Sequence, residues 1–401
     1  MEIDIGRGKK GRRAYGFDDI AIVPSRRTRD PDDIDISWTL GPYRFELPLV
    51  ASAMDGVVSP DTAVLVNELG GLGVLNLEGI WTRFENAEEQ LEAIAAAPAH
   101  EATRIMQRIY AEPVKPELIG RRIAEIKQRG AVACGSLTPQ KVRDYYEIAV
   151  EAGIDILVIQ GTVISAEHVS TTVEPLNLKE FIAEVPVPTV VGGCASYSTG
   201  LHLMRTGAVG VLVGVGPGAA CTTRGVLGIG VPQATAIADV AAARSQHMLE
   251  TGEYVNVIAD GGMRTGGDVS KAIAVGADSV MVGSPLARAK EAPGRGFHWG
   301  MATFHPSLPR GTRVSTRQDG TMEEILLGPA QENDGTFNLM GALKTSMATC
   351  GYEDIRSFQR AEVMVAPALM TEGKKLQSEQ SVGMGSNGRA AVSAGVGVAD
   401  D

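Results

Sequence analysis

The chain has 401 residues and a formal net charge of −11, with 44% hydrophobic and 21% charged residues, a composition typical of a globular enzyme. The acidic balance argues against general nucleic-acid binding, and no apolar run approaches the roughly 18 residues of a membrane-spanning helix. We therefore expect no nucleic acid and no membrane as partners.

Residues 1–13 are basic but precede no apolar segment, so they do not form a secretory signal, and a cytoplasmic protein is expected. A charged run at a chain end is typical of a solvated tail, while contact with a nucleic acid or a neighbouring subunit is the alternative. The four cysteines lie far apart without a C-x-x-C pair, which argues against a disulfide framework and a zinc site. They are Cys134, Cys194, Cys221 and Cys350.

Eight short runs rich in β-branched residues alternate along the chain with segments of helical periodicity. The helical pattern is clearest in Pro139–Ala152, Pro232–Leu249 and Gly267–Val275. This alternation predicts parallel βα units, and eight such units are typical of a closed (β/α)8 TIM barrel. A doubly wound sheet would need a G-x-G-x-x-G turn after its first strand, whereas Gly70–Gly73 precedes a strand. The predicted strands are Leu49–Ala53, Leu72–Leu75, Ala131–Cys134, Asp155–Ile159, Thr189–Val191, Val209–Val213, Val255–Ala259 and Ser279–Val282.

These elements predict one catalytic domain over residues 1–371, including an N-terminal arm over residues 1–45. A long irregular stretch, residues 285–334, separates the last strand from a helical segment near Gly335–Thr349 and is predicted to be a lid. The Gly/Ser/Ala-rich segment 372–401 is predicted to be disordered.

The most informative segment is the glycine-rich loop 214–225, which follows the sixth predicted strand and contains Cys221. Loops at the C-terminal ends of barrel strands carry the chemistry of this fold. Backbone N–H groups of a glycine turn and a helix start stabilise a thiolate, the attacking form of cysteine. Cys221 is therefore predicted to be a nucleophile, whereas Cys134 and Cys350 are predicted to be buried core residues.

The seventh predicted strand ends in Asp260-Gly261-Gly262, and the eighth ends in Gly283-Ser284. Loops at these positions often form a phosphate site from backbone N–H groups, and a preceding carboxylate suits a ribose diol. A plain turn with an Asx cap explains either segment alone but not both together. The pair therefore predicts a site for a nucleoside monophosphate.

Five segments in order resemble the IMP dehydrogenase/GMP reductase family from about Tyr15 to Ala361. They are Tyr15–Pro24, Ser52-Ala53-Met54-Asp55, the Cys221 loop, Ala259–Gly262 and Glu291-Ala292-Pro293-Gly294. The resemblance implies that Cys221 attacks the purine C2 carbon and that a purine nucleoside monophosphate is the substrate. It assigns substrate binding to Ser52, Met54, Gly218, Asp260, Gly261, Gly262, Gly283, Ser284, Gly300 and Met301.

The resemblance also implies NAD as cofactor, held by Gln160, Gly161, Thr162, Gly214 and Gly216. It implies a potassium ion bound by carbonyl groups of Gly216, Gly218 and Cys221, and a homotetramer or homo-octamer. The CBS-domain pair of many family dehydrogenases is absent, because only residues 78–130 join the second and third strands. The chain departs from the family pattern at three positions: Gln160 for an aspartate, Cys194 for an asparagine and Ala219 for a serine.

Family dehydrogenases activate water with an Arg-Tyr pair in the lid, but this lid has Arg310-Gly311-Thr312-Arg313 and no tyrosine. Arg313 is the nearest match. The alternative is a relay from Thr223 to a lid carboxylate, for which Glu323 is chosen over Glu324 and Asp319. The first hypothesis is an NAD-dependent IMP dehydrogenase that forms XMP; the alternatives are a GMP reductase and a non-catalytic purine-nucleotide-binding protein.

Overall fold

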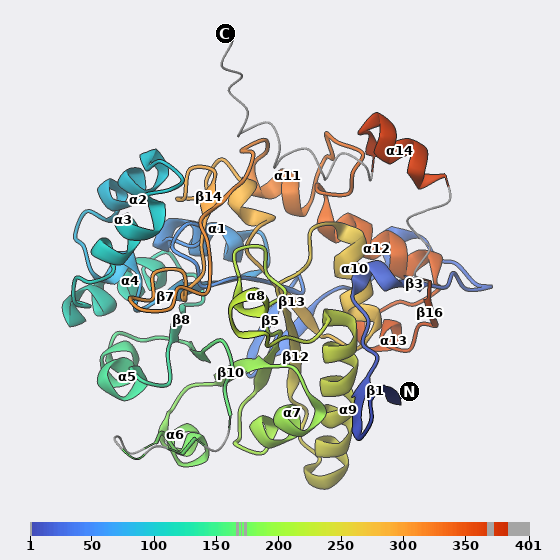
Figure 1. Cartoon of the computed structure of the whole chain (residues 1–401), viewed down its shortest axis with the longest axis horizontal. Helices are drawn as coiled ribbons and strands as arrows, with labels where there is room; N and C mark the ends of the chain where they lie inside the picture. The colour runs from blue at the N-terminus through green and yellow to red at the C-terminus, as the bar shows by residue number, and fades with distance from the viewer. Residues whose placement is uncertain (1, 166–167, 170, 172–174, 367–372, 384–401) are drawn as a thin grey trace.

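The structure is a computed structural model that describes residues 2–165, 168–169, 171, 175–366 and 373–383. Its centre is a closed barrel of eight parallel strands, in which the last strand pairs with the first (Figure 1). This architecture confirms the predicted (β/α)8 barrel. The strands are β6 (Leu49–Ala51), β7 (Leu72–Asn76), β8 (Cys134–Leu137), β9 (Ile156–Gln160), β10 (Thr189–Cys194), β11 (Gly210–Val213), β12 (Asn256–Asp260) and β13 (Ser279–Val282).

Helices between the strands form the outer layer, and several begin at side-chain caps. Ser196 accepts a hydrogen bond from the backbone of Thr199, and Thr265 accepts one from Asp268, which fixes where α7 and α10 start. The outer helices are α1 (Pro60–Glu68), α4 (Pro116–Lys127), α5 (Val142–Glu151), α6 (Leu178–Glu184), α7 (Tyr197–Met204), α9 (Gln233–Thr251), α10 (Gly266–Ala274) and α12 (Leu339–Thr349).

Strand β8 begins three residues later than the predicted Ala131–Cys134. It runs through Gly135 and Ser136, two residues with weak strand preference. A Cβ atom at Gly135 would lie 2.6 Å from the Leu77 side chain, so the neighbouring strand connection requires glycine there. Packing in the barrel, rather than intrinsic preference, therefore sets this strand.

The N-terminal arm closes the floor of the barrel. Strands β4 (Trp38–Leu40) and β5 (Tyr43–Phe45) form a hairpin whose Trp38, Leu40 and Phe45 pack on the inward-facing strand residues. The Trp38 indole donates to the Leu47 carbonyl at 2.8 Å, so its one polar atom is satisfied. The plugged floor leaves the C-terminal ends of the strands as the open face.

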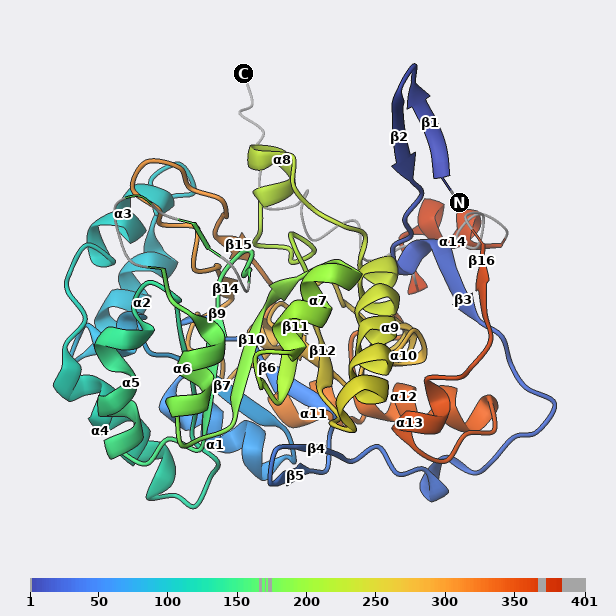
Figure 2. The ribbon, with the colours of Figure 1, turned by 90° about the horizontal axis from the view of Figure 1, so that it is seen from below.

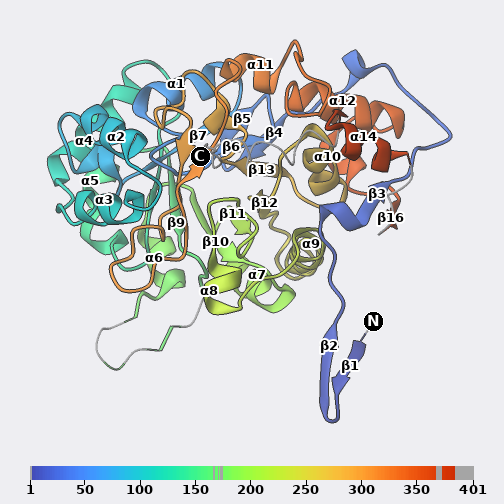
Figure 3. The same cartoon turned by 45° about the horizontal axis from the view of Figure 1, so that its top comes forward.

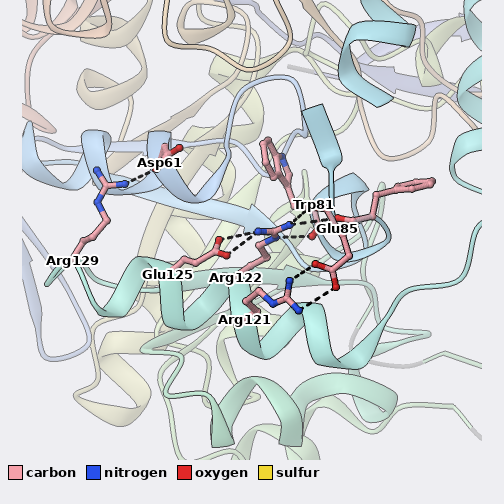
Figure 4. A network of polar contacts seen from close by, with 8 residues as sticks. Asp61, Trp81, Glu85, Arg121, Arg122, Glu125 and Arg129 are labelled. Carbon is pink, nitrogen blue, oxygen red and sulfur yellow. Dashed lines mark hydrogen bonds and ion pairs between the residues drawn. The ribbon is translucent and has the colours of Figure 1, made fainter. Parts of the chain in front are cut away.

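The connection between β7 and β8 is fully described and contains no CBS domain. It holds η3 (Ile80–Thr82), α2 (Ala87–Ala96), α3 (Ala102–Ile109) and α4. The buried Arg122 of α4 donates to the Trp81 carbonyl at 3.0 Å and the Glu85 carbonyl at 2.9 Å, and pairs with Glu125 at 2.8 Å (Figure 4). This network fixes the start of the α2–α3 segment on α4.

The predicted lid, residues 285–334, contains more regular structure than its composition indicated. It includes η4 (Leu286–Arg288), the antiparallel pair β14 (Phe297–His298) and β15 (Val314–Ser315), and α11 (Met322–Leu326). Residues 299–312, here called the lid tip, connect β14 to β15.

Residues near the N-terminus, which were predicted to form a solvated tail, are almost all exposed and form a β-hairpin. Strands β1 (Glu2–Gly6) and β2 (Lys9–Arg12) pair with each other and stand away from the barrel (Figures 2 and 3). Strand β3 (Ile20–Ile22) pairs with β16 (Val363–Val365) near the other end of the chain. The short helices η1 (Phe17–Asp19), η2 (Pro31–Asp33), α8 (Thr223–Leu227) and α13 (Ile355–Phe358) complete the main body.

Helix α14 (Lys374–Gln380) falls within the segment that was predicted to be disordered, so that prediction did not anticipate it. The rest of that prediction, at residues 372 and 384–401, lies outside the described residues. Among the residues that are described, no helix is both long and apolar enough to cross a membrane.

Candidate functional site

A cleft of about 1,210 Å³ opens at the C-terminal ends of the barrel strands. Its walls are the loops that follow the strands, together with the lid tip. Nearly all of the predicted site residues line it, although they come from loops that follow several different strands of the barrel. They are Ser52, Met54, Gln160, Gly161, Thr162, Gly214, Gly216, Gly218, Cys221, Thr223, Asp260, Gly261, Gly262, Gly283, Ser284, Gly300 and Met301.

Cys221 is the accessible thiol of the molecule. It is partly exposed, whereas Cys134, Cys194 and Cys350 are buried. Burial raises the pKa of Cys194 to about 12, so that thiol is protonated and unreactive at neutral pH. The Cys221 thiol donates to Oγ1 of the buried Thr223, the first residue of α8, at 3.2 Å. The geometry thus presents one thiol to the cleft.

Close packing explains the glycines that lead into the cysteine loop. A Cβ atom at Gly214 would lie 2.2 Å from the Asp260 carbonyl oxygen, and Gly216 has a φ of +78°. Gln233 bridges the two strand ends by donating to the carbonyls of Val213 at 2.7 Å and Asp260 at 3.1 Å. The loop is therefore held against the end of β12.

Asp260 lies at the end of β12 and accepts a hydrogen bond from Gln160 Nε2 at 3.3 Å. Burial raises the pKa of Asp260 to about 7, and the Gln160 hydrogen bond opposes that rise. The other amide atom of Gln160, Oε1, is buried without a partner within the described chain. Gln160 therefore supports Asp260 directly, which the sequence could not indicate.

The loops after β12 and β13 meet at one end of the cleft. Gly262 has a φ of +84°, and a Cβ atom at Gly283 would lie 2.5 Å from Met54 Sδ. Ser284 Oγ lies 2.8 Å from Nε2 of His298, a residue that sequence reasoning missed. Burial lowers the pKa of His298 to about 4, so its ring is neutral at pH 7.

The structure does not bring Arg313 into the cleft. Its guanidinium donates to the carbonyls of Ile94 and Ala97 at the C-terminal end of α2, at 2.8 Å for Ala97. Its Cζ also lies 4.2 Å from the centre of the Phe297 ring. Because its donors serve the helix end, Arg313 is not available to a ligand in the cleft.

The three candidate lid carboxylates also lie outside the cleft. Glu323 is exposed on α11, and Glu324 forms the capping box of that helix with Thr321. Asp319 accepts two hydrogen bonds from Arg288, at 3.1 and 2.8 Å. The predicted relay from Thr223 to a lid acid is therefore not formed, because each acid serves the lid's own structure.

Sequence reasoning also missed other residues of the cleft wall, among them one residue after α3 and several of the lid tip. Arg310, Phe304 and His305 belong to the lid tip, and Tyr110 follows α3. His305 Nδ1 accepts a hydrogen bond from the backbone of Leu308 at 3.0 Å, so the neutral ring carries its proton on Nε2. The Arg-Gly-Thr-Arg run of the lid could have indicated Arg310, but the prediction named Arg313, the other arginine of that run.

The lid tip is paired with the cysteine loop on both sides of Cys221. Cys221 and Gly311 form an antiparallel bridge. The Thr222 N–H donates to the Arg310 carbonyl at 3.1 Å, and the Thr312 N–H donates to the Ala220 carbonyl at 2.9 Å. The lid tip and the cysteine loop therefore form one continuous structure.

Comparisons with known proteins find relatives that match most of this chain. The model of the IMP dehydrogenase/GMP reductase domain matches residues 14–376. An uncharacterised oxidoreductase of Mycolicibacterium smegmatis is 47% identical over 372 residues, which cover 90% of this chain and 99% of the relative. Inosine-5'-monophosphate dehydrogenase of Methanocaldococcus jannaschii is 26% identical over 491 residues, covering 90% of this chain and 95% of that enzyme.

Among solved structures, the IMP dehydrogenase/GMP reductase-like protein of Corynebacterium glutamicum has a TM-score of 0.87 and 45% sequence identity, covering 91% of this chain and 97% of that chain. The barrel and its C-terminal cleft agree with these matches, which run through nearly the whole described chain. The chain belongs to the IMP dehydrogenase/GMP reductase family of oxidoreductases.

Proposed function

We propose that the protein is an NAD-dependent IMP dehydrogenase, which converts IMP, NAD⁺ and water to XMP and NADH. The observation that carries this proposal is the partly exposed Cys221 thiol at the mouth of the cleft, hydrogen-bonded to Thr223. With NAD⁺ bound as the hydride acceptor, addition of the Cys221 thiolate to C2 of the purine and loss of the C2 hydride would leave a covalent thioimidate, and hydrolysis of that adduct would release XMP and the free thiol.

The substrate-binding half of the cleft suits a nucleoside monophosphate. Asp260 accepts hydrogen bonds from the ribose hydroxyls, and Ser52 and Met54 border the base and ribose. The loops at Gly262 and Gly283 meet the phosphate, with Ser284 and the lid residues Gly300 and Met301 completing the walls. Gly218 and Gly261 allow the backbone to approach closely.

The remaining half of the cleft fits a dinucleotide, because a volume of about 1,210 Å³ exceeds what one mononucleotide fills. The residues proposed to hold it all line this space: Gln160, Gly161, Thr162, Gly214 and Gly216. NAD⁺, when bound, supplies the hydride acceptor.

The lid supports dehydrogenation over reduction. Arg310 lines the cleft, and its buried Nε has no partner within the described chain, so its guanidinium is available to orient water. Among the described residues of the lid that line the cleft, none is a carboxylate. We therefore assign the water-orienting role to Arg310 in place of Arg313, and assign none to Glu323.

Two parallel assays test the activity. Purified protein is incubated with IMP and NAD⁺, and separately with GMP and NADPH, while absorbance of the reduced cofactor is followed. The proposal predicts NADH formation in the first assay only. Oxidation of NADPH in the second assay alone would identify a GMP reductase. IMP binding without signal in either assay would identify a non-catalytic binding protein.

A lid variant sharpens this test. Arg310→Gln is expected to lower the release of XMP more than the formation of the covalent adduct, because hydrolysis is the step that needs water. Equal loss in both steps would contradict the assigned role. Arg317→Gln, at an exposed lid position, is the matched control.

The cysteine loop also offers a site for a potassium ion, and the N-terminal hairpin offers a surface for assembly. Carbonyl oxygens of Gly216, Gly218 and Cys221 lie in one glycine turn, a donor set that suits a monovalent cation, and Gly218 O already accepts from Cys221 N at 3.0 Å.

For assembly as a homotetramer or homo-octamer, the support is the N-terminal hairpin. Its Ile3 and Ile5 side chains are 43% and 71% exposed on one face, which a neighbouring subunit would cover.

A further inference from the structure

The lid tip is attached to the body of the protein at two opposite sides. One side pairs with the cysteine loop through Gly311. The other side rests on the α2–α3 segment, which belongs to the connection between β7 and β8. Contacts on this second side have no part in the proposed chemistry, and they determine where the tip can lie.

Arg313 makes the first contact with α2. It follows directly on the lid tip, and its guanidinium binds carbonyl oxygens of the last turn of α2: Ile94, Ala95 at 3.4 Å and the C-cap Ala97 at 2.8 Å. Carbonyls of the last helical turn carry the negative end of the helix dipole, and the Ile94 carbonyl also accepts from the Ala97 N–H at 3.3 Å. A cation there closes the helix end and ties it to the lid.

Tyr110 makes the second contact, at the start of the lid tip. Its hydroxyl accepts from the Trp299 indole at 2.7 Å and donates to the buried Asp55 at 2.5 Å. Its ring stacks on Phe304, with centroids 3.5 Å apart and planes 4° from parallel. Gln107 of α3 adds a hydrogen bond to the His305 carbonyl at 3.2 Å.

The helix pair itself is held in place. Arg122 fixes the chain that enters α2 through its hydrogen bonds to Trp81 and Glu85, and Arg121 pairs with Glu85 beside it (Figure 4). The lid tip is thus clamped between the cysteine loop and an anchored helix pair.

We propose that α2 and α3 form a brace that holds the lid tip closed over Cys221, with Arg313 as the positioning residue of this brace. This brace borders the same cleft as the proposed function, but its effect on the lid tip requires neither IMP nor NAD. Releasing Arg313 frees the C-terminal end of the tip, the Gly311 pairing with Cys221 weakens, and the thiol becomes more accessible.

Alkylation of Cys221 measures this directly. The full chain is treated with iodoacetamide, and the modified peptide is quantified by mass spectrometry, which separates Cys221 from the three buried cysteines. Arg313→Met is expected to raise the alkylation rate of Cys221 about tenfold, since it removes hydrogen bonds to carbonyls that each hold the closed tip. Arg313→Lys, which keeps a cation at the helix end, is expected to restore part of the parental rate.

The matched control is Arg317→Met, an arginine of the same lid whose side chain is 73% exposed. A second variant, Phe304→Ala, removes the stack on Tyr110 from the lid side and is expected to increase alkylation as well. Hydrogen exchange of residues 299–312 should rise in Arg313→Met while exchange in the barrel strands stays unchanged.

Equal alkylation rates in Arg313→Met, Arg317→Met and the parent would overturn the brace. Faster exchange throughout the barrel would do so too, because Arg313 would then serve overall stability. These readouts do not use turnover. A protein that fails to oxidise IMP yet shows the predicted alkylation pattern would contradict the proposed function and leave the brace standing.

Discussion

Asp260 should make nucleotide binding depend on pH around neutrality. Its pKa is raised to about 7 by burial, so in the empty cleft the carboxyl group is protonated in about half of the molecules at pH 7. In the proposed complex, ribose hydroxyls would donate to the ionised form, so a bound nucleotide would favour loss of that proton. Affinity for IMP is expected to rise as pH increases through this range.

The size of the effect follows from the ionised fraction. With a pKa of about 7, about one tenth of the carboxyl groups are ionised at pH 6 and about nine tenths at pH 8. If only the ionised form binds, the dissociation constant for IMP falls about tenfold across this interval, equivalent to about 1.4 kcal/mol. Calorimetric titration with IMP at a series of pH values measures it.

The phosphate group of IMP also contributes to the pH dependence of binding, because its second pKa is about 6. Asp260→Asn is the control, since its amide keeps the shape of the carboxyl group without titrating and leaves only the phosphate contribution. A second variant, Gln160→Met, removes the hydrogen bond that opposes the rise in the Asp260 pKa, so its binding curve should move to higher pH. Parallel curves for the parent and Asp260→Asn would refute the reasoning.

Two further predictions concern the lid and the N-terminal hairpin. Gly311→Ala would place a Cβ atom 3.0 Å from the Ala220 carbonyl oxygen and 2.3 Å from Oγ1 of Thr303 in the lid. Steady-state kinetics should therefore show a loss in kcat/KM of at least about tenfold, with little change in Tm. Gly225→Ala, where the added Cβ meets nothing within 4 Å, should behave like the parent; equal losses would contradict the close-packing argument. Replacing Ile3 and Ile5 together by serine should lower the mass measured by light scattering, and an unchanged mass would remove the hairpin from the assembly interface.

The barrel could be predicted because parallel strands buried on both faces appear as continuous β-branched runs between amphipathic helices. The exception, β8, contains Gly135 and Ser136, whose place in the sheet is decided by packing against Leu77. Most of the site could be predicted for a related reason. Motif residues that follow strands converge automatically when the strands are parallel and the barrel closes.

The lid could not be predicted in the same way. Arg310 and Arg313 stand three residues apart on one loop, and only the contact with the end of α2 decides which of them turns away from the cleft. The Tyr110–Trp299 hydrogen bond joins residues 189 positions apart, so no local pattern indicates it. The hairpin was missed because its two strands are short, β2 contains no apolar side chain, and their pairing is set by the turn between them.

The central claim is that Cys221 forms a covalent bond to the purine during turnover. Rapid acid quenching of the enzyme with IMP and NAD⁺, followed by mass spectrometry, should detect a nucleotide adduct on the Cys221 peptide, and Cys221→Ser should lose both the adduct and the activity. Turnover of IMP by Cys221→Ser at the parental rate, or steady turnover without any adduct on Cys221, would contradict the account.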